Sequence, residues 1–253
     1  MKNKGFTLIE LSIVLVVVAL IIGSVIQGQQ IIENARLSRI AKEVTEIKTA
    51  FNNFKLKYNA IPGDMDSANT MWASANNGDG DGSVDKPTDE MGETAEFWNQ
   101  MALSSVYPGS YSLSLSSGAF THYQAGVQMP VSKFKSNAGY LYYNPATSAD
   151  SLTVFTKVGN VLELGGCATS SQSGTFKYCS AGIMTGQRAE QLDKKIDDGE
   201  AATGSMMGVN ALTALATHTS GCSADYTDST AAYNVTSDVE ACRLFFWMEE
   251  PEN

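Results

Sequence analysis

Histidine is scarce in this chain of 253 residues, which contains only His122 and His218. Neither lies beside a nucleophile motif, and the chain has no glycine-rich phosphate loop and no H-E-x-x-H arrangement. Such motifs mark most nucleophilic, phosphate-transfer and zinc-dependent active sites. We therefore predict that the protein is not an enzyme, and we interpret both histidines as ordinary surface or packed residues.

Basic residues are also few, with 17 Lys and Arg against 27 Asp and Glu and a formal net charge of -10. An acidic surface does not favour contact with polyanions, and the sequence has no local basic patch to offset it. We therefore predict no nucleic-acid partner.

Proline is rare as well, with 6 in the chain and none within residues 6–60. In that stretch Leu11–Ile22 is apolar at every position but one. Residues 6–26 are long enough to cross a bilayer as a helix. Lys2 and Lys4 keep the N-terminus in the cytoplasm by the positive-inside rule, so the rest of the chain faces the periplasm or the exterior.

No small-residue cleavage site follows Leu20, so the apolar segment is not the discarded core of an ordinary secretory signal. Glu10 is the anomaly in this segment, because a lone carboxylate in hydrocarbon costs several kcal/mol and marks a functional position. It either has a partner or lies near the interface of a plain signal anchor, where water solvates it.

The N-terminal stretch Lys2-Asn3-Lys4-Gly5-Phe6-Thr7-Leu8-Ile9-Glu10, followed by the apolar run, resembles the leader and N-terminus of type IV prepilins. The resemblance implies that prepilin peptidase cuts between Gly5 and Phe6 and that the new amine of Phe6 is methylated. It also implies that Glu10 pairs with the N-terminal ammonium of a neighbouring subunit when subunits dock into a filament. Many pilins have a proline partway along this helix, where this chain has Gly23 and Gly28, so a kink there stays open.

Beyond the apolar segment, hydrophobic residues recur at alternating spacings of three and four, at Leu37, Ile40, Val44, Ile47, Phe51, Phe54 and Tyr58. This spacing predicts one buried stripe of a helix. The opposite face carries charged residues, with Arg39/Glu43 and Lys42/Glu46 as helix-supporting pairs. We expect a single helix of about 80 Å over residues 6–60, ended by Ile61-Pro62-Gly63.

The rest of the chain predicts an α+β fold, in which the long helix packs on an antiparallel β-sheet head, as the pilin resemblance also implies. The expected organisation is a leader at 1–5, a transmembrane and filament-core helix at 6–30, an amphipathic helix at 31–60 and a head at 61–253, whose acidic loop covers 76–93. Expected helices of the head are Thr94–Leu103 and Gln187–Ile196. Expected strands are Tyr111–Leu115, Gly139–Tyr143, Leu152–Val158 and Val161–Leu164, the last two joined by a Gly159-Asn160 hairpin turn.

The four cysteines lie in the second half, which the span places outside the cytoplasm. An even number there indicates disulfides, and no C-x-x-C spacing suggests a zinc or redox site. Of the three connectivities we favour Cys167–Cys179 with Cys222–Cys242, because each closes a short local loop.

The loop from Asn77 to Asp85 alternates oxygen side chains with glycines, at Asn77, Asp79, Asp81, Ser83 and Asp85. This spacing fills several positions of an EF-hand-like calcium loop. Thr88 stands where the bidentate Glu of an EF-hand belongs, so Asp89, Glu90 or Glu93 must complete the shell. Calcium binding and a merely solvated loop are both open.

Two segments, Lys57–Asp64 and Asp193–Gly199, resemble stretches that recur in large prepilin-like proteins of Gram-negative bacteria. We interpret Asp193–Gly199 as a capped helix end whose carboxylates order a turn, with a subunit contact as the alternative. Phe245-Phe246-Trp247 indicates a buried C-terminal element, with an exposed adhesive patch as the alternative.

The sequence thus predicts a structural subunit of a type IV pilus, held in the inner membrane with its head in the periplasm and then polymerised into an extracellular homo-oligomeric filament. Its partners are prepilin peptidase and the pilus or secretion assembly machinery. A type II secretion pseudopilin is one alternative, and a membrane-anchored calcium-binding module that does not polymerise is another.

Overall fold

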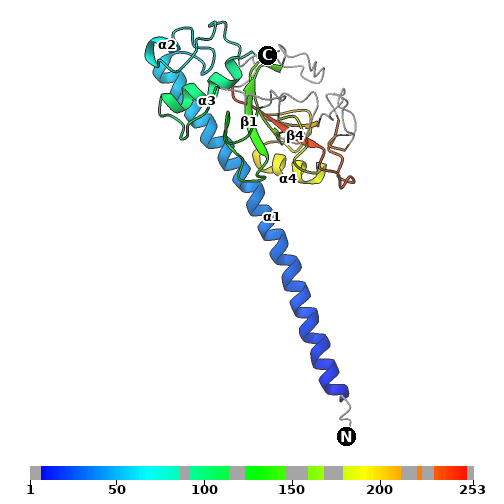
Figure 1. Cartoon of the computed structure of the whole chain (residues 1–253). Coiled ribbons are helices and arrows are strands. Elements are labelled where there is room, and N and C mark those ends of the chain that lie inside the picture. Colours follow the sequence, from blue (N-terminus) through cyan, green and yellow to red (C-terminus); the bar gives the residue numbers. More distant parts are fainter. Residues whose placement is uncertain are drawn as a thin grey trace, which may run out of the picture.

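The structure is a computed structural model of the whole chain, and the description covers residues 7–85, 92–113, 123–145, 159–167, 179–211, 221–223 and 231–249. One long helix packs against a head of short helices and a β-sheet along its C-terminal half. Its N-terminal half extends away from the head without covering (Figure 1).

Helix α1 runs from Leu8 to Tyr58, 51 residues without a break, which corresponds to about 75 Å. It passes through Gly23 and Gly28 as continuous α-helix. The helix is therefore unbroken in the region where a kink had been left open. Asn59 ends it in the left-handed conformation, at φ 51°, and donates its N–H to the Lys55 carbonyl at 2.8 Å. The predicted single helix is confirmed over the described residues.

The hydrophobic stripe of α1 faces the head as predicted. Six of its seven residues are buried and Tyr58 is partly buried. The predicted solvent-facing position of Glu43 is wrong, because this side chain is 7% exposed. Its carboxylate accepts hydrogen bonds from the Tyr140 hydroxyl at 2.6 Å, the Lys133 N–H at 2.9 Å and the Ser132 hydroxyl at 3.0 Å. Three hydrogen-bond donors from the head satisfy the buried carboxylate, which a surface pair with Arg39 alone would not do as well.

The head contains helices α2 (Ala68–Met71), α3 (Glu93–Leu103) and α4 (Gly186–Ile196). The predicted helices at 94–103 and 187–196 are confirmed as α3 and α4. An aromatic cluster joins α3, α1 and the sheet, with the Phe97 ring 4.2 Å from Tyr142 and the Phe51 ring 5.5 Å from Tyr142. Helix α4 packs beside α1 and the far strand of the sheet.

Four antiparallel strands form the sheet in the order β1-β2-β4-β3: β1 (Ala138–Tyr143), β2 (Val161–Gly166), β3 (Met206–Asn210) and β4 (Cys242–Trp247). The C-terminal strand therefore lies inside the sheet. Tyr140 pairs with Leu164, which pairs with Leu244, and directly paired residues share a face. This face meets α1, because Tyr140 bonds to Glu43 there. The α+β class is confirmed.

Two strand predictions need correction. Tyr111–Leu113 is not a strand, and the other two residues of the predicted segment lie outside the described residues. The hairpin across Gly159-Asn160 is wrong, because β1 and β4 occupy both edges of β2 over Val161–Leu164. Leu152–Val158 itself lies outside the described residues. Phe245–Trp247 is buried in β4, as predicted.

Candidate functional site

The predicted processing residues Gly5 and Phe6 lie outside the described residues, which begin at Thr7. Thr7 is the N-cap of α1, with its backbone in the extended conformation. Cleavage between Gly5 and Phe6 and the charge of the new amine stay predictions.

Glu10 forms a capping box with Thr7. The carboxylate Oε2 of Glu10 accepts hydrogen bonds from the N–H and the hydroxyl of Thr7, both at 2.8 Å. The Glu10 N–H donates to Thr7 Oγ1 at 3.3 Å. These bonds satisfy helix N-terminal groups that hydrocarbon could not. The spacing Thr7-Leu8-Ile9-Glu10 matches the S/T-x-x-E pattern, a signal that our sequence analysis missed.

Only one oxygen of the Glu10 carboxylate is used in this capping box. Among the described residues, Oε1 accepts no hydrogen bond, since both contacts go to Oε2. A carboxylate has lone pairs for about four hydrogen bonds. Glu10 can therefore cap its own helix and still accept bonds from an ammonium group of another subunit.

The N-terminal half of α1 is apolar and bare on every side. Its large hydrophobic side chains are exposed from 45% at Val18 to 90% at Leu8. In the described part of the chain α1 is the one helix long and apolar enough to cross a membrane. An apolar surface of this extent marks contact with lipid or with other protein.

The acidic loop is organised by Asp64, a residue that our metal prediction did not include. Asp64 is 4% exposed. Its Oδ1 accepts the N–H of Gly80 at 2.7 Å and of Asp81 at 3.1 Å, and its Oδ2 accepts the N–H of Gly82 at 2.9 Å. Burial raises the pKa of Asp64, which these N–H groups oppose and the charges of Asp81 and Asp79 reinforce. The Lys57–Asp64 segment thus ends in the residue that anchors the loop.

The structure brings together only part of the predicted calcium ligands. Carboxylate oxygens of Asp64, Asp79 and Asp81 lie within 4.8 Å of one another. Asn77 turns elsewhere, since its Oδ1 accepts the N–H of Asn69 at 2.9 Å. Ser83 donates its hydroxyl to Asp85 at 3.3 Å.

Glu93, one of the predicted closing ligands, lies beside this loop. It accepts the N–H of Asp79 at 3.0 Å and of Asp85 at 2.8 Å. Burial raises its pKa, and these two N–H groups oppose the shift. The other two, Asp89 and Glu90, lie outside the described residues. An EF-hand-like shell is therefore replaced by a loop whose backbone is tied to Asp64 and Glu93.

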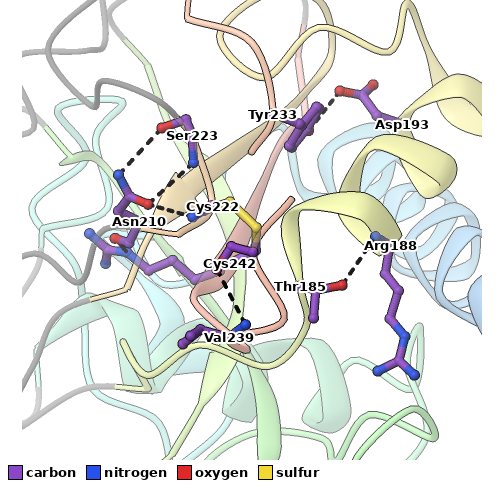
Figure 2. The surroundings of a disulfide bond; sticks show 11 residues. Thr185, Arg188, Asp193, Asn210, Cys222, Ser223, Tyr233, Val239 and Cys242 are labelled. Carbon is purple, nitrogen blue, oxygen red and sulfur yellow. Dashed lines mark hydrogen bonds between the residues drawn. A yellow bond between two sulfur atoms is a disulfide. The ribbon is translucent and has the colours of Figure 1, made fainter. Parts of the chain in front are cut away.

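Both disulfides join the cysteines in the favoured sequential pairing, Cys167 with Cys179 and Cys222 with Cys242. The second lies between β4 and a short segment that Asn210 holds (Figure 2). The Asn210 side-chain oxygen accepts the N–H of Cys222 at 2.8 Å. The linkage fastens the inner strand of the sheet to a neighbouring loop.

The end of α4 is a carboxylate-ordered turn, as interpreted from the sequence. Asp197 accepts the N–H of Ser205, and Asp198 accepts the Glu200 N–H at 2.8 Å and the Thr203 hydroxyl at 2.7 Å. Burial raises the pKa of Asp193 in the last turn to about 7; the Tyr233 hydroxyl opposes this shift and nearby carboxylates add to it.

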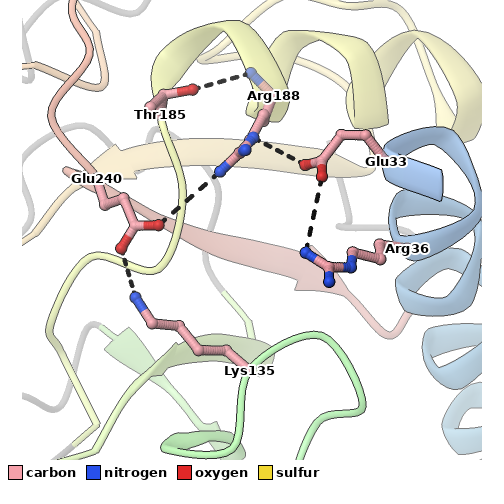
Figure 3. Close-up of polar contacts among 6 residues, drawn as sticks. All are labelled: Glu33, Arg36, Lys135, Thr185, Arg188 and Glu240. Atoms are coloured by element: carbon pink, nitrogen blue, oxygen red, sulfur yellow. Dashed lines mark hydrogen bonds and ion pairs between the residues drawn. The ribbon is translucent and has the colours of Figure 1, made fainter. Parts of the chain in front are cut away.

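A chain of ion pairs joins the middle of α1 to the head (Figure 3). Arg188, in the first turn of α4, contacts Glu33 of α1 at 2.8 Å and Glu240 at 3.9 Å. Glu33 also lies 4.0 Å from Arg36, and Glu240 pairs with Lys135. These contacts sit where α1 leaves the head, a role that no spacing in the sequence indicated. The two histidines, His122 and His218, lie outside the described residues.

Comparison with known proteins identifies one feature. Residues 1–26 match the family model described as the prokaryotic N-terminal methylation motif. No curated protein and no solved structure matches the chain. The chain therefore carries the signature of type IV pilin-like proteins and pseudopilins, which implies processing by prepilin peptidase and assembly in a pilus or secretion system.

Proposed function

We propose that this prepilin-type protein is a structural subunit of a type IV pilus, cleaved before Phe6 and polymerised through α1 into an extracellular filament. The observation that carries the proposal is the exposed apolar N-terminal half of α1, which overlaps the matched N-terminal methylation motif. Exposing so many apolar side chains to water along a helix of this length is strongly unfavourable. The bilayer covers it before assembly, and neighbouring helices cover it in the filament.

Assembly in this proposal exchanges lipid contacts for protein contacts around α1. Because lipid tails and apolar side chains are similar solvents, hydrophobicity alone gives no register. The charge of Glu10 supplies it, since its free Oε1 can pair with the ammonium of the partner's N-terminus. The head stays outside the filament core and forms the exposed surface.

The nearest alternative is a type II secretion pseudopilin, which uses the same processing and the same helix. The large head favours a specialised or minor subunit over a major one. The other alternative is an anchored module that does not polymerise. Such a module would not need the processing motif, which counts against it.

The deciding experiment is the intact mass of the protein in sheared surface filaments and in membranes under non-reducing conditions. We expect a chain that begins at methylated Phe6 in the sheared fraction. Processed chain confined to membrane and periplasm would point to the pseudopilin instead. Chain that still carries residue 1 would refute processing and leave the anchored module.

We also propose that the acidic loop takes up calcium through Asp79 and Asp81, with Asp64 holding the loop in shape. Support comes from the convergence of these three carboxylates. Chelation should lower the melting temperature of the wild-type protein and change that of Asp79→Asn/Asp81→Asn less. An equal response of both proteins would argue for a solvated loop.

A further inference from the structure

A second carboxylate cluster lies at the end of α4, far along the chain from the acidic loop. One carboxylate oxygen each from Asp193, Asp197 and Asp198 lies within 4.8 Å of the other two. Asp193 is fully buried in the last turn of the helix, whereas Asp197 and Asp198 are exposed beyond its end. The cluster therefore reaches from the protein interior to solvent.

The buried member of this cluster has an unsatisfied oxygen. Asp193 Oδ2 accepts the Tyr233 hydroxyl at 2.8 Å (Figure 2). Asp193 Oδ1 is buried and has no well-aligned hydrogen-bond donor in the described part of the chain; the Gly199 N–H lies near enough to lower the pKa of Asp193. A buried carboxylate oxygen without a donor is costly. Apart from that N–H, the polar groups of the cluster are carboxylates, which donate nothing when ionised.

No lysine ion pair fills this gap among the described residues. Lys194 pairs with Glu190 at 2.8 Å, and Lys195 reaches Asn34 of α1. Burial lowers the pKa of Lys48 on α1, and the nearby charge of Asp197 raises it. Lys48 makes no ion pair within 4 Å in the described part of the chain.

We propose that Asp193, Asp197 and Asp198 bind a calcium ion at the end of α4. Calcium takes oxygen ligands at about 2.3–2.6 Å, so two opposite ligands stand about 4.8 Å apart. The three oxygens lie no farther apart than that, and carboxylate oxygens are ligands that calcium prefers.

Two features of the turn prepare it for a cation. Backbone N–H groups and a hydroxyl already hold Asp197 and Asp198 in place, so few side-chain rotamers are lost on binding. The C-terminus of a helix also carries negative partial charge and carbonyls without helical partners. The bound ion would join α4, the turn toward β3 and the Tyr233 segment.

The test uses the full-length protein in detergent, depleted of divalent ions. Asp79→Asn/Asp81→Asn serves as the reference background, because it removes the carboxylates of the acidic loop. Calcium is titrated calorimetrically, and terbium is titrated with excitation of tyrosine. Tyr233 should sensitise terbium emission, because its hydroxyl contacts the ligand Asp193.

In the reference background we expect calcium binding and sensitised terbium emission to remain. Adding Asp197→Asn and Asp198→Asn, both at exposed positions, should weaken calcium affinity at least tenfold and remove that emission. Unchanged affinity in the combined variant, with native circular dichroism, would overturn the proposal. Asp198→Asn alone provides the same comparison if the combined variant does not fold, and Tyr233→Phe should lose emission while it still binds calcium.

Discussion

Glu10 combines two interactions at the residue scale, which different substitutions separate. Glu10→Gln retains a side-chain oxygen that accepts the hydrogen bonds of the capping box but loses the charge, whereas Thr7→Ala loses the cap and retains the charge. If pairing with a partner's ammonium sets the register, Glu10→Gln should insert into membranes normally but reduce sheared filaments at least tenfold. Immunoblots of sheared and membrane fractions measure both quantities.

Thr7→Ala is the matched control for that prediction. It should leave filament yield within about twofold of wild type, because a lost cap costs only about 1 kcal/mol. Loss of filaments in Thr7→Ala but not in Glu10→Gln would show that Glu10 acts through the helix cap alone.

A second residue-scale feature is the ion pair of Arg243 and Glu163, both fully buried and 2.9 Å apart. The Tyr143 hydroxyl also donates to Glu163, at 2.7 Å. Removing one member of such a pair leaves the other charge buried, which costs about 3–5 kcal/mol. We expect Glu163→Gln to lose about that much free energy of unfolding in urea titrations followed by tryptophan fluorescence.

The exposed pair Lys42–Glu46, 3.7 Å apart, is the control for the buried one. Glu46→Gln should change stability by less than about 1 kcal/mol, because water screens surface pairs. If Glu46→Gln and Glu163→Gln lost similar free energies of unfolding, burial would not explain the contribution of the Arg243–Glu163 pair to stability.

At the element scale, the C-terminal half of α1 has one face packed on the head and another face in solvent. Phe51 is fully buried against Phe97 and Tyr142, whereas Leu56 is 85% exposed on the same helix. Phe51→Ala should cost about 3–5 kcal/mol of head stability through lost burial and a cavity. Leu56→Ala should change it by less than about 0.5 kcal/mol.

Urea unfolding of both variants in detergent gives this comparison. If Phe51→Ala were no more destabilising than Leu56→Ala, the head would not depend on its contact with α1. The stem, which is the part of α1 before its first buried residue Leu37, would then be only a tether, and its orientation relative to the head would not be set by packing.

At the scale of the whole molecule, the ion pairs around Arg188 lie where the stem leaves the head. Arg188 connects α1 through Glu33 with the segment before β4 through Glu240. We expect Arg188→Ala to retain the head fold but to raise hydrogen exchange of α1 amides near residues 30–40 severalfold. Partly exposed ion pairs stabilise local geometry more than global folding.

Lys194→Ala is the control at this scale, because Lys194 pairs with Glu190 inside α4. It should leave exchange in α1 as in wild type. Equal exchange in α1 for both variants would mean that apolar packing alone fixes the stem at this level.

The elements that the sequence predicted well are those with a local physical cause. The stripe from Leu37 to Phe54 follows from the helical period, and α4 from its own spacing and its Asp-Gly stop. The membrane-length apolar segment and the processing motif are likewise contiguous in the chain. Sequential cysteine pairing followed from loop length, and the structure has it.

Predictions from the sequence were wrong or incomplete for residues whose partners come from distant parts of the chain. Glu43 looked like a surface residue until the head supplied three donors, and β4 displaced a local hairpin by entering the sheet beside β2. The contacts of Asp64 and of the Asp193 cluster also depend on folding, because turns bring their hydrogen-bond donors and neighbouring carboxylates close. The local pattern of apolar residues therefore determined that α1 is one long helix, with an apolar N-terminal half and an amphipathic C-terminal half. Tertiary packing alone decided which carboxylates are buried and where they converge, because burial depends on the whole head rather than on neighbours in sequence.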